Sequence, residues 1–491
     1  MKKVYSIFLT FAAASVVVFS CSKPSENENG EKQEQNQNQE QKQEEEQNPS
    51  QEQEQTELEP FAFEVSSASE DMIFDGNPEF TLHLTNPNDV AATAEITFTV
   101  NTDKGKKFAS VEMTREVAAK GSADVTVTTE ETVPPGFYKV SGKVNGKRYL
   151  AAQNIGVKPF QIESAPWDYV SKEDFGDFWD KAYEQLKAID MNVSFYNTVR
   201  AGTYMVQMNS IPDGLEGDPM VIRGYYIEPA KDGKKHPAIV HYYGYDDFPG
   251  DVTPLELPSG SSEFAHLWLS SRGQRINSRP RDKRSDGVEE DFTNPYKIQW
   301  FTVNFGDKDS YYYRGAYMDC VQGIRFLALC DDEKVKDRID MDNVFVEGMS
   351  QGGAFSYAAA SLSQEYPVKA VAAAVAFMGD FPDYFTIVPN EGGGFPYMAQ
   401  TCKKALNYTD DQMYAFLSYF DTKNLATRVN CPIMACIGLQ DNICPPHTNI
   451  APYNNALTPA SDKKMTFYKD MGHAYPPGWN TDAEAFFKKL E

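Results

Sequence analysis

The chain is poor in cysteine and has no cysteine pair at metal-binding spacing. Seven of its 491 residues are cysteine, and none of them form the C-x-x-C pair that is typical of zinc sites. The sequence therefore predicts no metal site. The spacing favours no particular disulfide, and we expect most of these cysteines to be small buried side chains.

Positive charge is also scarce. The chain carries 46 Lys and Arg against 71 Asp and Glu, which gives a formal net charge of −25. The basic residues form no stripe or cluster along the sequence, so the sequence predicts no nucleic-acid partner. The acidic excess, much of which follows Cys21, favours solubility and does not indicate a site.

A long apolar run stands at the N-terminus. Two lysines precede the run from Val4 to Phe19, and polar sequence follows it instead of a stop-transfer pattern. These features are typical of a secretory signal. Because residues 18–21 resemble the lipobox of bacterial lipoproteins, we predict a signal peptide over 1–21 and lipidation of Cys21. The alternative is an ordinary cleaved signal with a chance cysteine. We expect a membrane-anchored lipoprotein, periplasmic or at the cell surface.

The two segments that follow differ sharply in pattern. Residues 22–59 are rich in Glu, Gln and Asn, and they lack the apolar surface that would offset the entropy of ordering, so we predict a disordered tether. Residues 60–159 alternate apolar and polar side chains in short runs such as 80–84, 95–100 and 124–128. Asn145-Gly146 between two such runs predicts a type I′ hairpin. We expect an immunoglobulin-like β-sandwich that acts as a spacer, or alternatively binds glycan.

The remaining residues, 160–491, mix strands with helices. Residues 173–186 have apolar side chains at helical spacing, whereas 237–243, 344–346 and 431–437 are short branched runs typical of buried parallel strands. This alternation predicts an α/β fold with a doubly wound sheet and its chemistry at the carboxyl ends of the strands.

One turn in this part carries a nucleophile pattern. Ser350 follows the strand at 344–346 and precedes an alanine-rich helix, and Gly348 and Gly352 flank it where a side chain would collide. This G-x-S-x-G turn lifts a hydroxyl above a sheet and directs a helix N-terminus at it. The pattern predicts acyl transfer by Ser350.

A serine hydroxyl needs a positioned base and an orienting carboxylate. In an α/β-hydrolase the order along the chain is Ser, acid, His. His473 lies on a loop after a strand near the C-terminus, whereas His447 follows two prolines and is expected at a helix start, as a surface or capping residue. Asp441 directly follows a strand and is the predicted acid. Asp470 is interpreted as a solvated loop residue.

The oxyanion hole needs two backbone amides. One belongs to the residue after the nucleophile, which is Gln351, and the other to an early loop. The strand at 238–242 runs into Tyr243-Gly-Tyr245, which makes the amide of Tyr245 the second candidate.

These residues carry a family resemblance that covers about two-thirds of the chain. From about Ala165 onward the sequence resembles the acetyl xylan esterase and cephalosporin C deacetylase family, carbohydrate esterase family seven. The matching pieces are Phe175–Trp179, His241–Tyr245, Arg272-Gly273-Gln274, Tyr311–Asp319, Gly348–Gly353, Ala376–Phe381, Ser418–Ala426, Gly438–Pro446 and Gly472-His473. Arg272-Gly273-Gln274 together with Ser350–Gly353 separates this family from generic lipases and peptidases of the same fold.

The resemblance implies a serine esterase of the α/β-hydrolase fold that removes acetyl groups from sugars or xylo-oligosaccharides through an acetyl-enzyme, without a cofactor. Ser350 would be the nucleophile, Asp441 the acid and His473 the base. The family usually has glutamate directly after this histidine, whereas this chain has Ala474. The family forms ring-shaped hexamers, but the tether and the first domain are not part of its usual core, so a homo-oligomer stays open.

Two other functions remain as alternatives. A peptidase of the prolyl-oligopeptidase type shares the fold and the serine turn, but its additional β-domain is a much larger propeller. A surface glycan-binding protein would place the function in the sandwich, and the full set of triad residues argues against it.

Overall fold

The computed structural model describes residues 58–160, 165–245, 256–292, 296, 299–388 and 394–491. The predicted signal peptide, Cys21 and nearly all of the tether lie outside the described residues. Residues 58–491 form one compact unit. Among its described helices, none combines the length and the apolar character that crossing a membrane requires.

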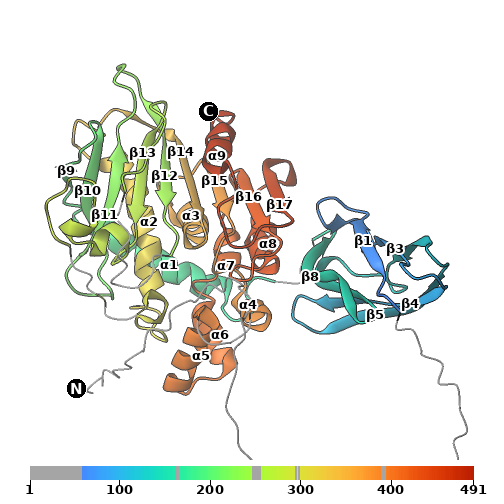
Figure 1. Ribbon diagram of the computed structural model, residues 1–491. Coiled ribbons are helices and arrows are strands. Elements are labelled where there is room, and N and C mark those ends of the chain that lie inside the picture. Colours follow the sequence, from blue (N-terminus) through green and yellow to red (C-terminus); the bar gives the residue numbers. More distant parts are fainter. Residues whose placement is uncertain (1–57, 161–164, 246–255, 293–295, 297–298, 389–393) are drawn as a thin grey trace, which may run out of the picture. The chain divides into compact units, whose positions relative to one another are not determined.

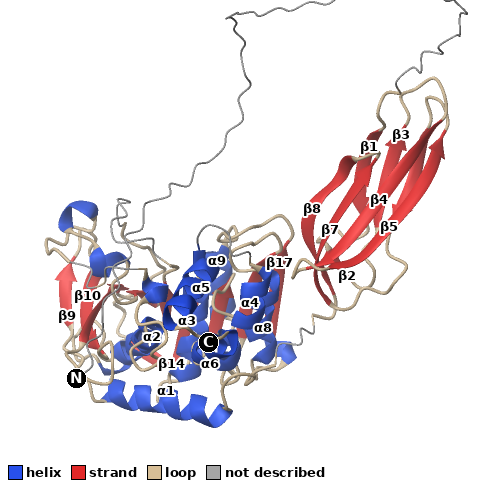
Figure 2. Ribbon diagram, turned by 90° about the horizontal axis from the view of Figure 1, so that it is seen from below, coloured by secondary structure: helices blue, strands red, loops and turns tan. Residues whose placement is uncertain are grey.

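The N-terminal part of this unit consists of two sheets (Figures 1 and 2). One has the order β1-β3-β6 and the other β2-β8-β7-β4-β5. Along β4 and β7 buried and accessible side chains alternate, which gives each sheet one face toward an apolar core. Of the predicted runs, 80–84 and 95–100 lie within strands, and 124–128 lies in a strand except for its last residue. The bounds are β1 Ala62–Ser67, β2 Ile73–Phe74, β3 Phe80–Thr85, β4 Ala92–Thr102, β5 Lys107–Val117, β6 Ser122–Val127, β7 Gly136–Val144 and β8 Lys147–Val157.

The hairpin between β7 and β8 has the predicted turn. Asn145 has φ 44° and Gly146 has φ 78°. Positive φ at both central residues is the requirement of a type I′ turn, and asparagine and glycine are the residues that meet it with least strain. This prediction is confirmed.

The rest of the chain is built on a nine-stranded sheet with the order β17-β16-β15-β14-β12-β13-β11-β10-β9, whose two edges are clear in Figure 1. The strands from β17 to β13 are parallel, and β11, β10 and β9 are antiparallel. The bounds are β9 Ser194–Asn197, β10 Thr203–Ser210, β11 Met220–Ile227, β12 His236–Tyr242, β13 Ala265–Ser270, β14 Ile339–Met349, β15 Ala370–Ala374, β16 Ile433–Gly438 and β17 Lys463–Tyr468.

Helices cover both faces of this sheet. Alternate strand residues such as Val240 and Val346 join the core that contains α1, α2 and α3. Their neighbours Ile239 and Phe345 join the core that contains α9. Because both faces are buried, the parallel strands are continuously apolar, which confirms the predicted doubly wound sheet. The bounds are α1 Lys172–Lys187, α2 Tyr312–Leu329, α3 Gln351–Leu362, α8 Pro446–Asn455 and α9 Trp479–Lys488.

Between β15 and β16 the chain forms further helices: α4 Phe381–Ile387, α5 Gly394–Leu406, α6 Asp410–Leu417 and α7 Thr422–Ala426. Pro382 lies in the first turn of α4, where its missing amide costs nothing, and Tyr384 is buried. Short 3-10 turns complete the fold at Arg275–Ser278, Arg281–Lys283, Trp300–Thr302 and Ala460–Asp462.

Candidate active site

Ser350 occupies a strained turn between β14 and α3. Its backbone has φ 58° and ψ −118°, a combination that a non-glycine residue rarely adopts. A Cβ at Gly348 would lie 2.5 Å from the backbone of Gly352, and a Cβ at Gly352 would lie 2.1 Å from the carbonyl oxygen of Tyr242. Both glycines are therefore required for the strand and the helix to approach so closely, as the sequence pattern predicts.

The predicted partners of Ser350 lie beside it. The Ser350 hydroxyl lies 2.9 Å from Nε2 of His473, and Nδ1 of His473 lies 2.8 Å from Oδ2 of Asp441. Asp441 is buried and its Oδ1 accepts the amides of Ile443 at 2.9 Å and Cys444 at 2.8 Å. The carboxylate is thus fixed, and Nδ1 of His473 donates to it, which leaves Nε2 free to accept the serine proton.

The competing candidates do not join this arrangement. Asp470 is exposed. His447 lies in α8, as expected, but it is buried and not at the surface, with its Nε2 2.8 Å from Oδ2 of Asp383. The sequence interpretation missed this burial because the partner carboxylate comes from α4, a helix distant from His447 along the chain.

The two predicted oxyanion donors belong to segments that lie next to the serine. Gln351 is the first residue of α3, where backbone amides have no partner within the helix. A Cβ at Gly244 would lie 3.9 Å from the Cβ of Ser350, so the segment that leads to Tyr245 runs against the nucleophile turn. The Tyr245 hydroxyl donates to Oε1 of Gln299 at 2.8 Å, which anchors this residue from its side chain.

The side chain of Gln351 points into the core and connects α3 to the Arg272-Gly273-Gln274 segment. Its Oε1 accepts from the Tyr313 hydroxyl at 2.9 Å and from Nε2 of Gln274 at 3.3 Å. Its own Nε2 donates to Oε1 of Gln274 at 3.2 Å. The paired amides hold the first turn of α3, and with it the amide of Gln351, in one position.

Arg272 is a structural residue without access to solvent. It binds Asp319 through Nε at 2.9 Å and through NH2 at 2.6 Å, and it also contacts Asp213 at 3.0 Å. Burial alone would lower the pKa of Arg272, but the charge of Asp319 outweighs it and raises the pKa. Gly273 has φ 74°, and a Cβ at Gly315 would lie 2.0 Å from the guanidinium. Gly315 thus makes room for this buried ion pair.

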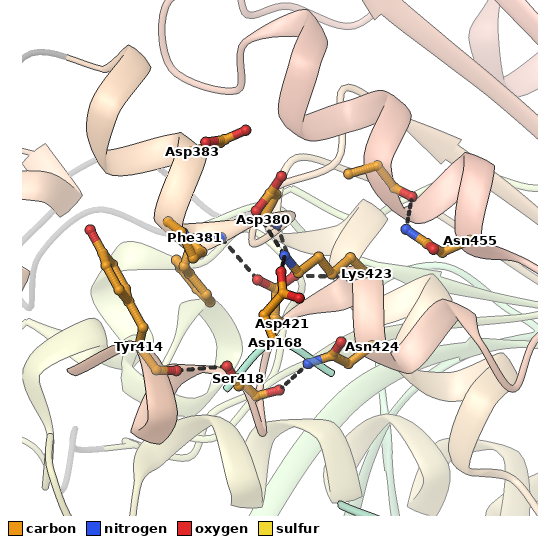
Figure 3. Close-up of polar contacts among 12 residues, drawn as sticks. Asp168, Asp380, Phe381, Asp383, Tyr414, Ser418, Asp421, Lys423, Asn424 and Asn455 are labelled. Carbon is orange, nitrogen blue, oxygen red and sulfur yellow. Dashed lines mark hydrogen bonds and ion pairs between the residues drawn. The ribbon is translucent and has the colours of Figure 1, made fainter. Parts of the chain in front are cut away.

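A second buried charge cluster supports the segment after β15 (Figure 3). Lys423 Nζ lies 2.9 Å from Oδ1 of Asp380, and Asp421 accepts the amides of Asp380 at 2.8 Å and of Phe381 at 2.9 Å. Burial raises the pKa of Asp421 to about 6, although Lys423 acts in the opposite direction. Because the Phe377 amide in the same segment donates to the Ser350 carbonyl at 2.9 Å, the cluster stabilises the nucleophile turn. Nothing in the sequence pattern indicates this role of Lys423.

A cysteine that the sequence left without a role also lies at the site. Cys444 is buried, and its sulfur lies within 4.8 Å of ligand atoms of Asp441 and His473. Burial, together with the charge of Asp441, raises the pKa of its thiol well above the usual value. A neutral thiol therefore packs against the triad. Within the described ranges the six cysteines Cys320, Cys330, Cys402, Cys431, Cys436 and Cys444 are unpaired thiols.

Comparison with known proteins decides the family. A family model described as acetyl xylan esterase matches residues 166–490. The chain belongs to the acetyl xylan esterase family. The acetyl esterase Axe7A of Xylanibacter ruminicola is 26% identical over 347 residues, which cover 68% of this chain and 72% of that protein.

Solved structures of the family have the same fold as this acetyl xylan esterase family member. An acetyl xylan esterase from Paenibacillus sp. R4 is 26% identical with a TM-score of 0.50, and covers 64% of this chain and 94% of its own. Acetyl xylan esterase 1 from Thermoanaerobacterium sp. JW/SL YS485 is 24% identical with a TM-score of 0.50, and the match covers 65% of this chain and 94% of that chain. The protein is a carboxylic ester hydrolase of the acetyl xylan esterase type, with an α/β-hydrolase domain from about residue 166 onward.

Proposed function

We propose that Ser350, His473 and Asp441 remove acetyl groups from acetylated sugars or xylo-oligosaccharides. Ser350 Oγ attacks the acetyl carbonyl while Nε2 of His473 takes the hydroxyl proton. Asp441 holds the imidazole in the required tautomer and stabilises the imidazolium that forms. His473 then protonates the leaving sugar hydroxyl. Water attacks the acetyl-enzyme by the same route, and acetate leaves.

The amides of Gln351 and Tyr245 meet the oxyanion in this proposal. Both belong to segments held by side-chain contacts away from the substrate, Gln351 through Gln274 and Tyr245 through Gln299. Donors that are fixed before the reaction need no reorganisation when charge develops, and one such donor contributes about 3 kcal/mol to the transition state.

The observation that carries the proposal is the continuous chain from the Ser350 hydroxyl through His473 to Asp441, at 2.9 and 2.8 Å. The direct test measures two activities of the full chain. One is acetate release from acetylated xylo-oligosaccharides and other acetylated sugars, and the other is cleavage of a matched peptide amide. We expect acetate release from the sugars and no peptide cleavage. Cleavage of the peptide without acetate release would overturn the proposal in favour of a peptidase.

We also propose that the N-terminal sheets form an immunoglobulin-like spacer and that Cys21 carries a lipid anchor. The size of this part, its two sheets and its alternating burial support the first point, and the apolar run that ends at Cys21 supports the second. The full precursor should enter the detergent phase after expression in a bacterial host, and Cys21→Ala should stay in the aqueous phase. Equal partitioning of the two would contradict the anchor. Binding of acetylated xylan by residues 60–159 alone would contradict a pure spacer.

A further inference from the structure

A buried carboxylate lies close to the nucleophile in sequence and has no role in the mechanism above. Glu347 precedes Ser350 on β14 and is 2% exposed. Its Oε1 lies 2.5 Å from Nδ1 of His241, and its Oε2 accepts the indole N–H of Trp479 at 3.2 Å. A buried carboxylate is costly unless it is paired and hydrogen-bonded, and here both oxygens are engaged.

The contacts of Glu347 continue across three parallel strands. His241 on β12 has its Nε2 2.9 Å from Nδ1 of His266 on β13, and Nε2 of His266 lies 2.9 Å from the Ser261 carbonyl. The ring of Trp268 stacks on His241 with 3.9 Å between centroids and 5° between planes. The orientation of the His241 ring is therefore fixed.

Hydrogen-bond logic places the protons of this chain. A carbonyl only accepts, so Nε2 of His266 carries a hydrogen. Burial, and after it the charge of His241, lowers the pKa of His266 to about 3; this ring is neutral and its Nδ1 accepts from His241. Nε2 of His241 is then a donor, and the contact between its Nδ1 and Glu347 needs one further proton. Every polar atom is satisfied only when the pair of His241 and Glu347 retains that proton.

The other end of the chain leads to the catalytic base. Trp479 is the first residue of α9 and directly follows the loop between β17 and α9, which carries His473. It is buried against residues of β12, β14 and β15. The indole contact is thus a fixed point for the loop that presents His473 to Ser350. Ala474, next to His473 in this loop, is exposed, and the carboxylate that Trp479 contacts belongs to Glu347 of β14.

We propose that Glu347 is a positioning residue for His473, which it holds in place through the indole of Trp479, with His241 and His266 fixing the carboxylate. This role rests on the proposed triad and adds a residue to it. Glu347 does not touch substrate. It restricts the loop to conformations in which Nε2 of His473 faces the Ser350 hydroxyl. A displacement of about 1 Å from that geometry costs on the order of a hundredfold in rate.

The test compares two substitutions of Glu347 in the full chain, with p-nitrophenyl acetate as substrate. Glutamine accepts from Trp479 through its oxygen and donates to His241 through its amide, so Glu347→Gln should keep kcat within about threefold. Glu347→Ala loses both contacts and should lower kcat by roughly 10- to 100-fold, with KM changed less than about threefold. Trp479→Phe keeps the packing, removes the donor and should lower kcat by about tenfold.

Thermal unfolding of each variant separates positioning from loss of fold. Turnover per folded molecule should fall in Glu347→Ala and Trp479→Phe, and be rescued in Glu347→Gln. If all three variants kept the kcat of the native protein per folded molecule, the proposal would be overturned. A change that appears in KM alone would also overturn it. Ser350→Ala distinguishes this result from failure of the proposed function. If that variant stays active, the triad itself is wrong, whereas an inactive Ser350→Ala beside a fully active Glu347→Ala rejects only the role of Glu347.

A spectroscopic signature checks the proton chain independently. The proton between Nδ1 of His241 and Glu347 should give a low-field proton resonance that persists in Ser350→Ala and disappears in Glu347→Gln, since glutamine needs no additional proton. The proton between His473 and Asp441 should give a separate resonance that disappears in Asp441→Asn. Retention of all low-field resonances in Glu347→Gln would contradict the assignment.

Discussion

Two polar centres of the α/β domain are built from the same kinds of residue and differ in what they leave open. The Arg272 and Asp319 side chains are each 0% exposed and are joined by two hydrogen bonds. At the triad, Asp441 is equally buried, but the His473 side chain is 16% exposed and Ser350 sits on a strained backbone. The difference indicates that the ion pair holds the fold, whereas the triad keeps a reactive end accessible. Substitutions at the two centres should therefore affect different quantities.

Removal of the nucleophile should have the largest effect. Ser350→Ala should lower kcat on p-nitrophenyl acetate by roughly a millionfold, because no other group takes its place in the acyl-enzyme, while the midpoint of thermal unfolding changes little. Ser356→Ala is the matched control, since Ser356 lies in α3, the helix that follows Ser350, and its hydroxyl donates to the Gly352 carbonyl. It should keep nearly full activity. Comparable losses in the two variants would show that the serine turn has no special role.

Substitution of the orienting carboxylate comes next. Asp441→Asn should lower kcat by about 10⁴-fold, because an amide in this place favours the wrong tautomer of His473. Asp470→Asn is the control, as Asp470 is closer to His473 in sequence but exposed. Steady-state kinetics of both variants decide between the two carboxylates. A greater loss in Asp470→Asn would reverse the assignment.

The buried ion pair should show the opposite behaviour. Arg272→Met leaves Asp319 buried without its partner and should lower the free energy of unfolding by about 3–5 kcal/mol in urea denaturation. Arg281→Met, at an exposed pair with Asp291, should change it by less than about 1 kcal/mol. Activity of Arg272→Met should follow its folded fraction. A large loss of kcat in fully folded protein would place Arg272 in the chemistry.

The smallest effect concerns the strain at the serine. Ser350→Gly and Ser350→Ala both remove the hydroxyl, but only glycine adopts φ 58° without strain. Ser350→Gly should therefore be more stable than Ser350→Ala by about 1 kcal/mol in the same denaturation experiment. Equal stability of the two variants would show that the turn stores no strain.

The sequence predicted best those features whose causes are local. Asn145-Gly146 specifies its own turn, and Gly348 and Gly352 specify the serine elbow, because the backbone conformation depends on those residues alone. Asp441 and His473 were found because their order along the chain and their places after strands are fixed by the fold. The two turns have the predicted conformations, and Asp441, His473 and Ser350 lie within hydrogen-bond distance of one another in that order, while their catalytic roles stay a proposal.

Features that depend on distant segments could not be predicted in the same way. The contacts of Glu347 with His241 and Trp479 join residues separated by 106 and 132 positions. Nothing local in the sequence indicates these contacts. The burial of His447 likewise depends on α4, whose Asp383 contacts it from a distant part of the chain. These residues meet only when the parallel sheet and its helices are assembled, which depends on the whole domain and not on a local pattern.

The most direct test of the account is the identity of the acylated residue. The full chain should be mixed rapidly with an acetyl ester, quenched in acid and digested, and the peptides analysed by mass spectrometry. We expect a single acetyl group on the peptide that contains Ser350, transient in the native protein and absent in Ser350→Ala. Acetylation of another residue, or full turnover by Ser350→Ala, would contradict the account.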